Sequence, residues 1–476
     1  MPDENPQCHI HDQVGEWEVD DIRENVCVKV SDHHFSKHTD GKYYCVFHLP
    51  PTEEKDAKTF EKIFRARLNS VEEKLATIEK LPEEERREAR EKISYDFRYV
   101  RFPAVYLSGY KFEAWANFRS ATFSADAYFS LATFSAYADF SSATFSARAS
   151  FGSATFSADA DFMSATFLAD ANFENTKFFA KNGSISFYKT NFAGDTFFDR
   201  TKFGNEVSFE SAIFGTESYV IFRRAFFAGK VDFRYCCAEG YLIFSNPRQS
   251  RKSSFELQHA VFEKASRISF HTVDLRPSWF VNIDSRKFVF TDIFWINRDW
   301  DFWNRNINRE LESLEERGIK DQKRRLFEIA ARQLAVNAEE NNRYEDAAEF
   351  RYMAMETRRL EETKKLSFSR FITWLYKWTS GYGESWTRAA LVLLVLILFF
   401  GVLYASPLSL FDYGSDQFRW MYKGEGLVHS LSVAAFQRPE PKAADSWTKF
   451  FIILETIFAP LQAALLALAI RRKFMR

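Results

Sequence analysis

Two cysteine and histidine pairs near the N-terminus have the residue types and the spacing of metal ligands. Cys8 and His11 are separated by two residues, and so are Cys45 and His48. Zn²⁺ in structural sites takes four nitrogen and sulfur ligands in a tetrahedron, and a short turn lets two of them reach one ion. The two pairs therefore predict a Cys2His2 zinc site.

The region that contains these pairs has little else to hold it together. Residues 1–52 include few aliphatic side chains, so a bound metal would have to supply folding free energy. Four protein ligands leave no open coordination position, which predicts structural zinc and not catalytic zinc. Cys27 or His38 could replace one of the four, and the alternative is that all are ordinary polar or buried residues. Five cysteines without a secretory signal favour a reducing compartment over a disulfide framework.

The middle of the chain repeats every eleven residues around phenylalanine, as in "ATFSADAYFSL" and "ATFSAYADFSS". From Phe118 to Phe178 the spacing between phenylalanines alternates between five and six residues, with alanine two positions before nearly every one. Neither a helix nor a single strand puts residues with this spacing on one face. A chain that turns a corner at each step points every phenylalanine inward, and stacked coils then bury a continuous ladder. The repeat predicts a right-handed β-helix of roughly square cross-section.

This pattern resembles the pentapeptide-repeat family, whose fold is the quadrilateral β-helix. The six-residue sides depart from the five-residue repeat of that family and imply bulged faces. At about 22 residues per coil we expect about seven coils. Some family members mimic DNA with an acidic face, but here outward aspartates are diluted by serine and offset by arginine and lysine.

The repeat carries no motif that would catalyse a reaction. Its outward positions hold no metal cluster, nucleophile motif or phosphate loop, so we expect a scaffold or binding surface and no enzyme activity. The formal net charge of −1 argues against nucleic acid as a partner. An unidentified cytoplasmic protein is the expected partner of this rod.

Helical patterns flank the repeat on both sides. Residues 53–91 carry apolar residues at helical spacing among charged ones, with a break at Pro82, and predict a helical connector. After Trp303, two apolar stripes separated by Asn341 and Asn342 predict two helices joined by a turn. We expect this hairpin to be a packed spacer, with partner recognition as the alternative.

Two apolar segments near the C-terminus are long enough to cross a bilayer, residues 389–405 and 450–470. Basic residues flank the first and close the second, so the positive-inside rule places both ends of this region in the cytoplasm. The sequence thus predicts a multi-pass protein of a bacterial inner membrane, with cytoplasmic N- and C-termini and residues 406–449 outside.

The two segments and the apolar stretch between them, residues 426–436, resemble the two-helix potassium-channel module. Relatives that fuse pentapeptide repeats to this module carry "GYGE" and an arginine before the first span, and a glutamate early in the second. Here these are residues 381–384, Arg388 and Glu455. The resemblance implies a homotetramer.

The chain departs from that module at the selectivity filter. A Thr-x-Gly-Tyr-Gly run should follow the central stretch, but residues 437–441 read "QRPEP". Two prolines and no glycine cannot form the carbonyl ladder, so we expect no selective potassium conduction. The "GYG" of this chain precedes the first span, on its cytoplasmic side, and predicts a turn with Ser385 capping the following helix.

Three residues are candidates for a pore of another kind. Arg438 would lie at its mouth, and Glu455 would either line it or bond to the central stretch, since a carboxylate rarely faces lipid. Pro460 could kink the second span where some channels bend to gate.

These observations predict a multidomain membrane protein in five regions. We expect a sensor or interaction scaffold whose oligomeric membrane domain could conduct ions. The alternative is a non-conducting, membrane-anchored scaffold that binds protein. The regions are a zinc-binding head (1–52), a helical connector (53–95), the β-helix (96–285), a helical hairpin linker (286–380) and a two-span membrane domain (381–476).

Overall fold

The computed structural model divides the chain into two compact units, residues 1–296 and residues 297–476. The described residues are 26–27, 35–37, 42–49, 57–179, 183–250, 253–297, 305–361, 368–414, 417–437 and 439–474.

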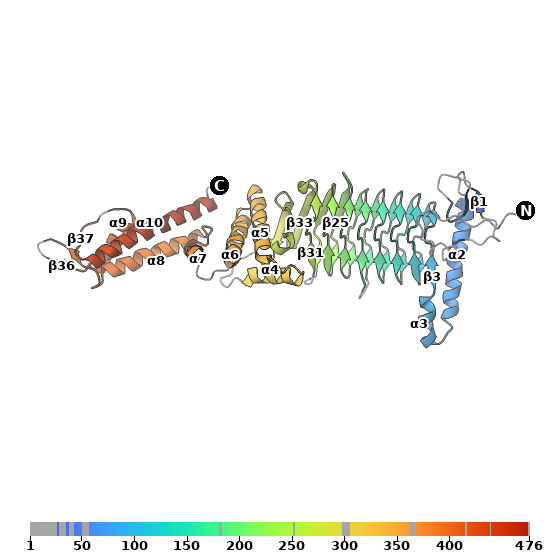
Figure 1. The fold of residues 1–476 in the computed structure, drawn as a ribbon, viewed down its shortest axis with the longest axis horizontal. Coiled ribbons are helices and arrows are strands. Elements are labelled where there is room, and N and C mark those ends of the chain that lie inside the picture. Colours follow the sequence, from blue (N-terminus) through green and yellow to red (C-terminus); the bar gives the residue numbers. More distant parts are fainter. Residues whose placement is uncertain are drawn as a thin grey trace, which may run out of the picture. The chain divides into compact units, whose positions relative to one another are not determined.

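A four-faced β-solenoid makes up most of the N-terminal unit (Figure 1). It runs from β3 (Ser94–Asp96) to β34 (Val289–Trp295), in four parallel sheets of seven, eight, eight and nine strands. Most strands have two or three residues, and longer ones gather toward the end, in β25 (Tyr219–Arg223), β29 (Tyr241–Ser245) and β33 (Ile268–Leu275). The predicted quadrilateral β-helix is confirmed.

Phenylalanine rings form the core of the solenoid by stacking from coil to coil. Phe123 lies 4.6 Å from Phe145, centroid to centroid, with the two planes 2° apart. Neighbouring ladders meet edge to face, as where Phe129 contacts Phe140 at 5.5 Å and 84°. Both arrangements are favourable for aromatic pairs, so the repeat buries its bulkiest side chain in a well-ordered core.

A left-handed corner of the coil recurs once in each eleven-residue repeat. Ser120, Leu131 and Ser142 each have a left-handed backbone, with φ between 56° and 61°. The buried alanine after each corner donates its N–H to the phenylalanine before it, as in Ala121 to Phe118 at 3.0 Å. A small side chain is needed there because it faces the crowded interior.

The solenoid has about nine turns, and the expected seven are too few. The additional turns lie at the ends, where other apolar residues take the inward positions. Tyr95 and Leu107 are fully buried in the first coils, and Leu275 and Trp295 in the last strands. Strand β34 extends the solenoid past the expected boundary at residue 285.

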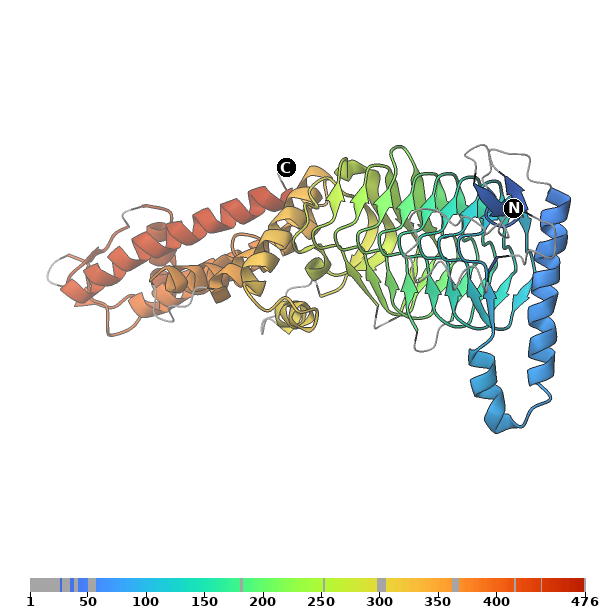
Figure 2. The ribbon, with the colours of Figure 1, turned by 45° about the vertical axis from the view of Figure 1, so that its right-hand side comes forward.

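Helix α2 (Ala57–Ile78) covers the first coil, as Figure 2 shows. Its Phe60 contacts Phe102 at 5.6 Å and its Phe64 contacts Phe97 at 5.0 Å, between ring centroids. A break at Pro82 separates it from α3 (Glu83–Glu91), as predicted. The helix therefore caps the open end of the phenylalanine stack, which would otherwise face water.

Seven helices make up the described part of the C-terminal unit. A turn at Asn341 and Asn342 joins helices α5 (Lys323–Glu340) and α6 (Tyr344–Glu361), which confirms the predicted hairpin. Three short strands, β35 (Phe411–Asp412), β36 (Phe418–Arg419) and β37 (Lys442–Ala443), form an antiparallel sheet near the tip of the last two long helices. The helices are α4 (Arg305–Glu316), α5 (Lys323–Glu340), α6 (Tyr344–Glu361), α7 (Phe368–Ser380), α8 (Trp386–Tyr404), α9 (Lys423–Ala434) and α10 (Ser446–Phe474).

Candidate functional site

A buried group of two cysteines and a histidine lies beside the capping helix. Strand β2 (Tyr43–Cys45) pairs with β1 (Phe35–Lys37), and the turn after it folds His48 back toward Cys45. The Cys45 Sγ lies 3.1 Å from His48 Nδ1, and the Cys27 Sγ lies 3.5 Å from the same nitrogen. Ligands of one tetrahedral zinc ion are about 3.5 Å apart, sulfur to nitrogen. This donor set therefore fits a metal ion.

The structure brings part of the predicted ligand set together. Cys45 and His48 are brought together, and Cys27, which the sequence offered only as a replacement, joins them. Cys8, His11 and His38 lie outside the described residues. Among the residues that the structure describes, the group has three members.

A cation and an aromatic contact fix this group against α2. The guanidinium of Arg67 donates to the carbonyl of Val26 at 3.1 Å. Burial lowers the pKa of Arg67, while the carboxyl of Asp96 and the two thiols oppose that shift. A neighbouring cation favours the thiolate form that binds metal. Phe47, from the same turn, packs on Phe60 at 5.5 Å, so a metal here would brace the head against the solenoid cap.

Replacing Cys45 with serine tests this site. We expect the full chain to hold a zinc ion and the Cys45→Ser chain to lose it, because a hydroxyl is a poor zinc ligand. Elemental analysis of the purified proteins measures the ion. Cys237→Ser is the matched control, since burial raises the pKa of that thiol and it lies on the solenoid. A metal-free wild-type chain whose residues 42–49 are still protected from hydrogen exchange would contradict the prediction.

Helices α8 and α10 are long and apolar enough to cross a membrane, and they cover the expected spans except for the last residue of the first, Ala405. Only 17% of the most apolar window of each helix is buried inside the structure. Soluble proteins rarely expose contiguous apolar surface of this extent. The Ser385 side chain accepts from the N–H of Arg388 at 3.4 Å, so the predicted cap of the first span is confirmed.

Helix α9 packs against both long helices. A Cβ atom on Gly426 would lie 2.4 Å from the carbonyl oxygen of Gly401, and one on Gly401 would lie 3.1 Å from the Cα of Leu427. The two backbones therefore touch, as membrane helices do where both carry small residues. This contact holds the central apolar stretch beside α8.

Glu455 joins the three helices from inside the bundle. Its carboxylate accepts from the Tyr404 hydroxyl of α8 at 2.7 Å and from the Ser430 hydroxyl of α9. It is fully buried. The expected bond to the central stretch is therefore present, and a pore-lining role stays a prediction. Pro460 lies inside α10, and Arg438 lies outside the described residues.

The "GYG" turn connects α7 to α8. Gly381, Tyr382 and Gly383 are all left-handed, with φ of 58°, 62° and 76°. The positive φ of Gly383 favours glycine, and a Cβ atom there would also meet the hydroxyl of Tyr376 at 2.7 Å. The tripeptide forms a turn, as predicted.

Side chains of this turn bind the helical hairpin and the end of α10. Glu384 accepts from Arg351 of α6 at 2.8 Å and from Arg472 of α10 at 2.9 Å. The Tyr382 hydroxyl donates to Glu356 of α6 at 2.6 Å. The hairpin is thus bonded to the bases of both apolar helices.

Glu356 is the centre of this junction. It is fully buried and accepts from Arg359 at 2.6 Å and from Lys377 of α7 at 3.0 Å. Burial would raise its pKa, but the hydrogen bonds from Arg359 and Tyr382 and the charge of Lys377 hold that pKa below its ordinary value. Sequence reasoning missed this residue, although a carboxylate three positions after Met353, on the apolar stripe of α6, was a usable signal.

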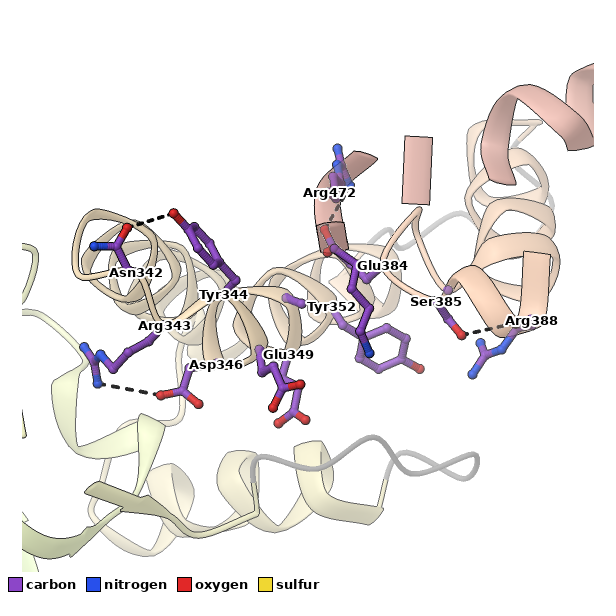
Figure 3. A pocket seen from close by; sticks show the side chains of 14 residues that line it. Asn342, Arg343, Tyr344, Asp346, Glu349, Tyr352, Glu384, Ser385, Arg388 and Arg472 are labelled. Carbon is purple, nitrogen blue, oxygen red and sulfur yellow. Dashed lines mark hydrogen bonds and ion pairs between the residues drawn. The ribbon is translucent and has the colours of Figure 1, made fainter. Parts of the chain in front are cut away.

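A cavity of about 770 Å³ lies beside the junction. Figure 3 shows Arg343 paired with Asp346 on one side of it and Arg472 reaching Glu384 on the other. Its charges are mixed and largely satisfied by one another, so the cavity favours neither an anion nor a cation.

No protein-family model, no curated protein and no solved structure matches this chain. The fold therefore has to define the class by itself. It is a four-faced parallel β-solenoid joined to a helical unit with two apolar helices.

Proposed function

We propose that this chain is an integral protein of a bacterial inner membrane, whose cytoplasmic solenoid acts as a sensor or interaction scaffold. Helices α8 and α10 cross the bilayer, and the basic residues at their near ends face the cytoplasm. The membrane helices assemble as a homotetramer that conducts ions without potassium selectivity. The resemblance of the repeat to pentapeptide-repeat proteins supports the scaffold role.

The exposed apolar surface of the helical bundle carries this proposal. Leu394 and Phe399 of α8 and Ile457 of α10 are all more than 40% exposed, and each lies at a depth that lipid would cover. Helix α9 exposes Val428 and Leu431 as well. A short apolar helix held between two spans has the arrangement of a pore helix, and its outer face suits lipid or another copy of the chain.

The residues that follow α9, where a potassium filter would stand, support the lack of potassium selectivity. Phe436 is left-handed, and prolines stand at positions 439 and 441. Proline and the bulky side chains around it do not form the ring of backbone carbonyls that replaces the hydration shell of potassium.

A non-conducting anchor is the second candidate, and Glu455 favours it. Its hydrogen-bond partners Tyr404 and Ser430 belong to the same chain, so the carboxylate is satisfied without water or a passing ion. In that case the membrane unit would only anchor and oligomerise the solenoid.

Bilayer recordings of the purified full-length protein distinguish the two candidates. We expect currents with similar permeability for sodium and potassium, and a tetramer by native mass spectrometry. No current across a range of ionic conditions would favour the anchor. Strong potassium selectivity would contradict the absence of a filter.

Replacing Glu455 with glutamine tests its role in ion preference. Glutamine keeps a hydrogen-bonding group toward Tyr404 and Ser430 but removes the charge, so we expect the cation-to-anion permeability ratio to fall. Thr456→Val, at the exposed neighbouring position, is the control. An unchanged ratio would remove Glu455 from the pore. The cation-to-anion permeability ratio of Arg438→Gln tests the predicted place of Arg438 at the pore mouth, and an unchanged ratio would remove it from the pore.

A further inference from the structure

One face of the solenoid carries a groove rich in positive charge. It has a volume of about 940 Å³ and lies along strands β22 (Lys202–Phe203), β26 (Phe226–Phe227) and β30 (Arg248–Gln249). Its charged and aromatic lining consists of Phe179, Arg200, Lys202, Arg224, Phe226 and Arg248.

The regular coil places these cations in rows. Lys202, Phe226 and Arg248 occupy equivalent positions on three successive strands, in register. Arg200 and Arg224 occupy equivalent left-handed corners, with φ of 54° and 56°. Successive coils are about 4.8 Å apart, so the charged groups repeat at multiples of that distance.

Two other arginines of the solenoid pair with carboxylates, unlike the four cations of the groove. Arg223 pairs with Asp199 at 3.0 Å, and Arg234 pairs with Asp232 at 2.7 Å. Within the described part of the chain, no ion pair forms at the four basic positions of the groove. Four like charges close together repel one another, and a bound anion would relieve that repulsion.

An aromatic ring stands at the edge of this positive surface. Phe179 is 48% exposed, whereas its neighbour Phe178 is buried in a ladder with Phe156 and Phe203. Gly204 lies beneath it, where a Cβ atom would approach the ring edge at 3.6 Å. An exposed ring beside arginine and lysine suits a ligand with both a planar base and phosphates, because bases stack on aromatic side chains.

We infer that this groove binds a nucleotide with two or more phosphates. The phosphates contact the arginine and lysine side chains, and the base stacks on Phe179. The volume lies within the range of about 300–1,000 Å³ that is usual for small-molecule sites. From β18 (Lys177–Phe178) to β30 the sheet advances three strand spacings, about 14 Å, which suits one nucleotide better than a strand of several. This inference rests on the proposed sensor role of the solenoid and names its ligand class.

Calorimetry on the full-length protein in detergent tests it, with ATP, tripolyphosphate and adenosine as probes. We expect ATP to bind, tripolyphosphate to bind more weakly and adenosine not to bind measurably. Arg200→Glu combined with Arg224→Glu should weaken ATP binding at least about 10-fold, because it removes two charge-assisted contacts. Lys189→Glu is the matched control, since Lys189 is another exposed cation at a left-handed corner, outside the groove.

Phe179→Leu separates stacking from charge. It should weaken ATP binding and leave tripolyphosphate binding unchanged. The inference would be overturned if neither ATP nor tripolyphosphate bound. It would also be overturned if Lys189→Glu lost as much ATP affinity as the double variant of Arg200 and Arg224. A single-stranded oligonucleotide that binds more tightly than ATP, and loses affinity in the double variant, would also overturn it, in favour of nucleic acid. The bilayer recordings measure conduction and do not depend on nucleotide binding. A negative calorimetry result would therefore overturn the nucleotide site alone and leave the membrane proposal standing.

Discussion

Replacing Phe140 with alanine should destabilise the solenoid by about 3–5 kcal/mol, the usual cost of deleting a buried aromatic ring. Phe140 is fully buried and stacks on Phe118 at 4.9 Å and on Phe162 at 5.1 Å, between ring centroids. It also meets Phe129 and Phe151 edge to face. Alanine would leave a cavity between three coils that the rigid backbone cannot close.

Hydrogen exchange measures this effect coil by coil. Each coil contacts only its neighbours, so the loss of protection should be greatest in residues 116–167 and should decrease toward both ends. Phe294→Ala is the control, because that phenylalanine is 67% exposed. Phe140→Leu should cost less than alanine. A Phe140→Ala chain with unchanged protection throughout the solenoid would contradict this account of the core.

The phenylalanine period was readable from sequence because each coil repeats the same inward side chain. Where the coil has another apolar residue in place of phenylalanine, such as Leu107 and Leu257, the backbone still stacks but the sequence signal fades. Any apolar side chain of suitable size fills the inward position. The number of coils was underestimated for that reason.

The metal group shows a different limit. Two intervening residues predicted that Cys45 and His48 would lie together, because a single turn determines their distance. Cys27 lies 21 positions before His48, a separation over which no local spacing predicts a contact. Local geometry was predictable, and the long-range ligand was left open.

The junction shows the same limit more strongly. The left-handed turn and the Ser385 cap follow from residues close in sequence. The bonds of that turn join residues far apart, such as Glu384 and Arg472, separated by 88 positions. Sequence therefore indicated the shape of the turn, while its partners depended on the packing of the helices.

Replacing Glu356 with alanine should loosen this junction by about 3–5 kcal/mol, the usual effect of removing one partner of a buried ion pair. Lys377, itself buried, and Arg359 would lose their carboxylate, and the Tyr382 hydroxyl would lose its acceptor. Hydrogen exchange of α6 and α7 should rise. Glu345→Ala, at an exposed position on the same helix, is the matched control.

The pH dependence separates the charge of Glu356 from its packing. Because its folded pKa lies below the ordinary value of 4.5, ionisation adds stability that is fully present above that value. The added stability is lost as the pH falls through the folded pKa. We therefore expect wild-type protection of α6 and α7 to stay constant down to about pH 4.5 and to fall below it. Glu356→Gln should lack this component of the fall, since it has no proton to bind. Equal pH profiles for the wild type and Glu356→Gln would mean that packing, and not the buried carboxylate, holds the hairpin to the turn.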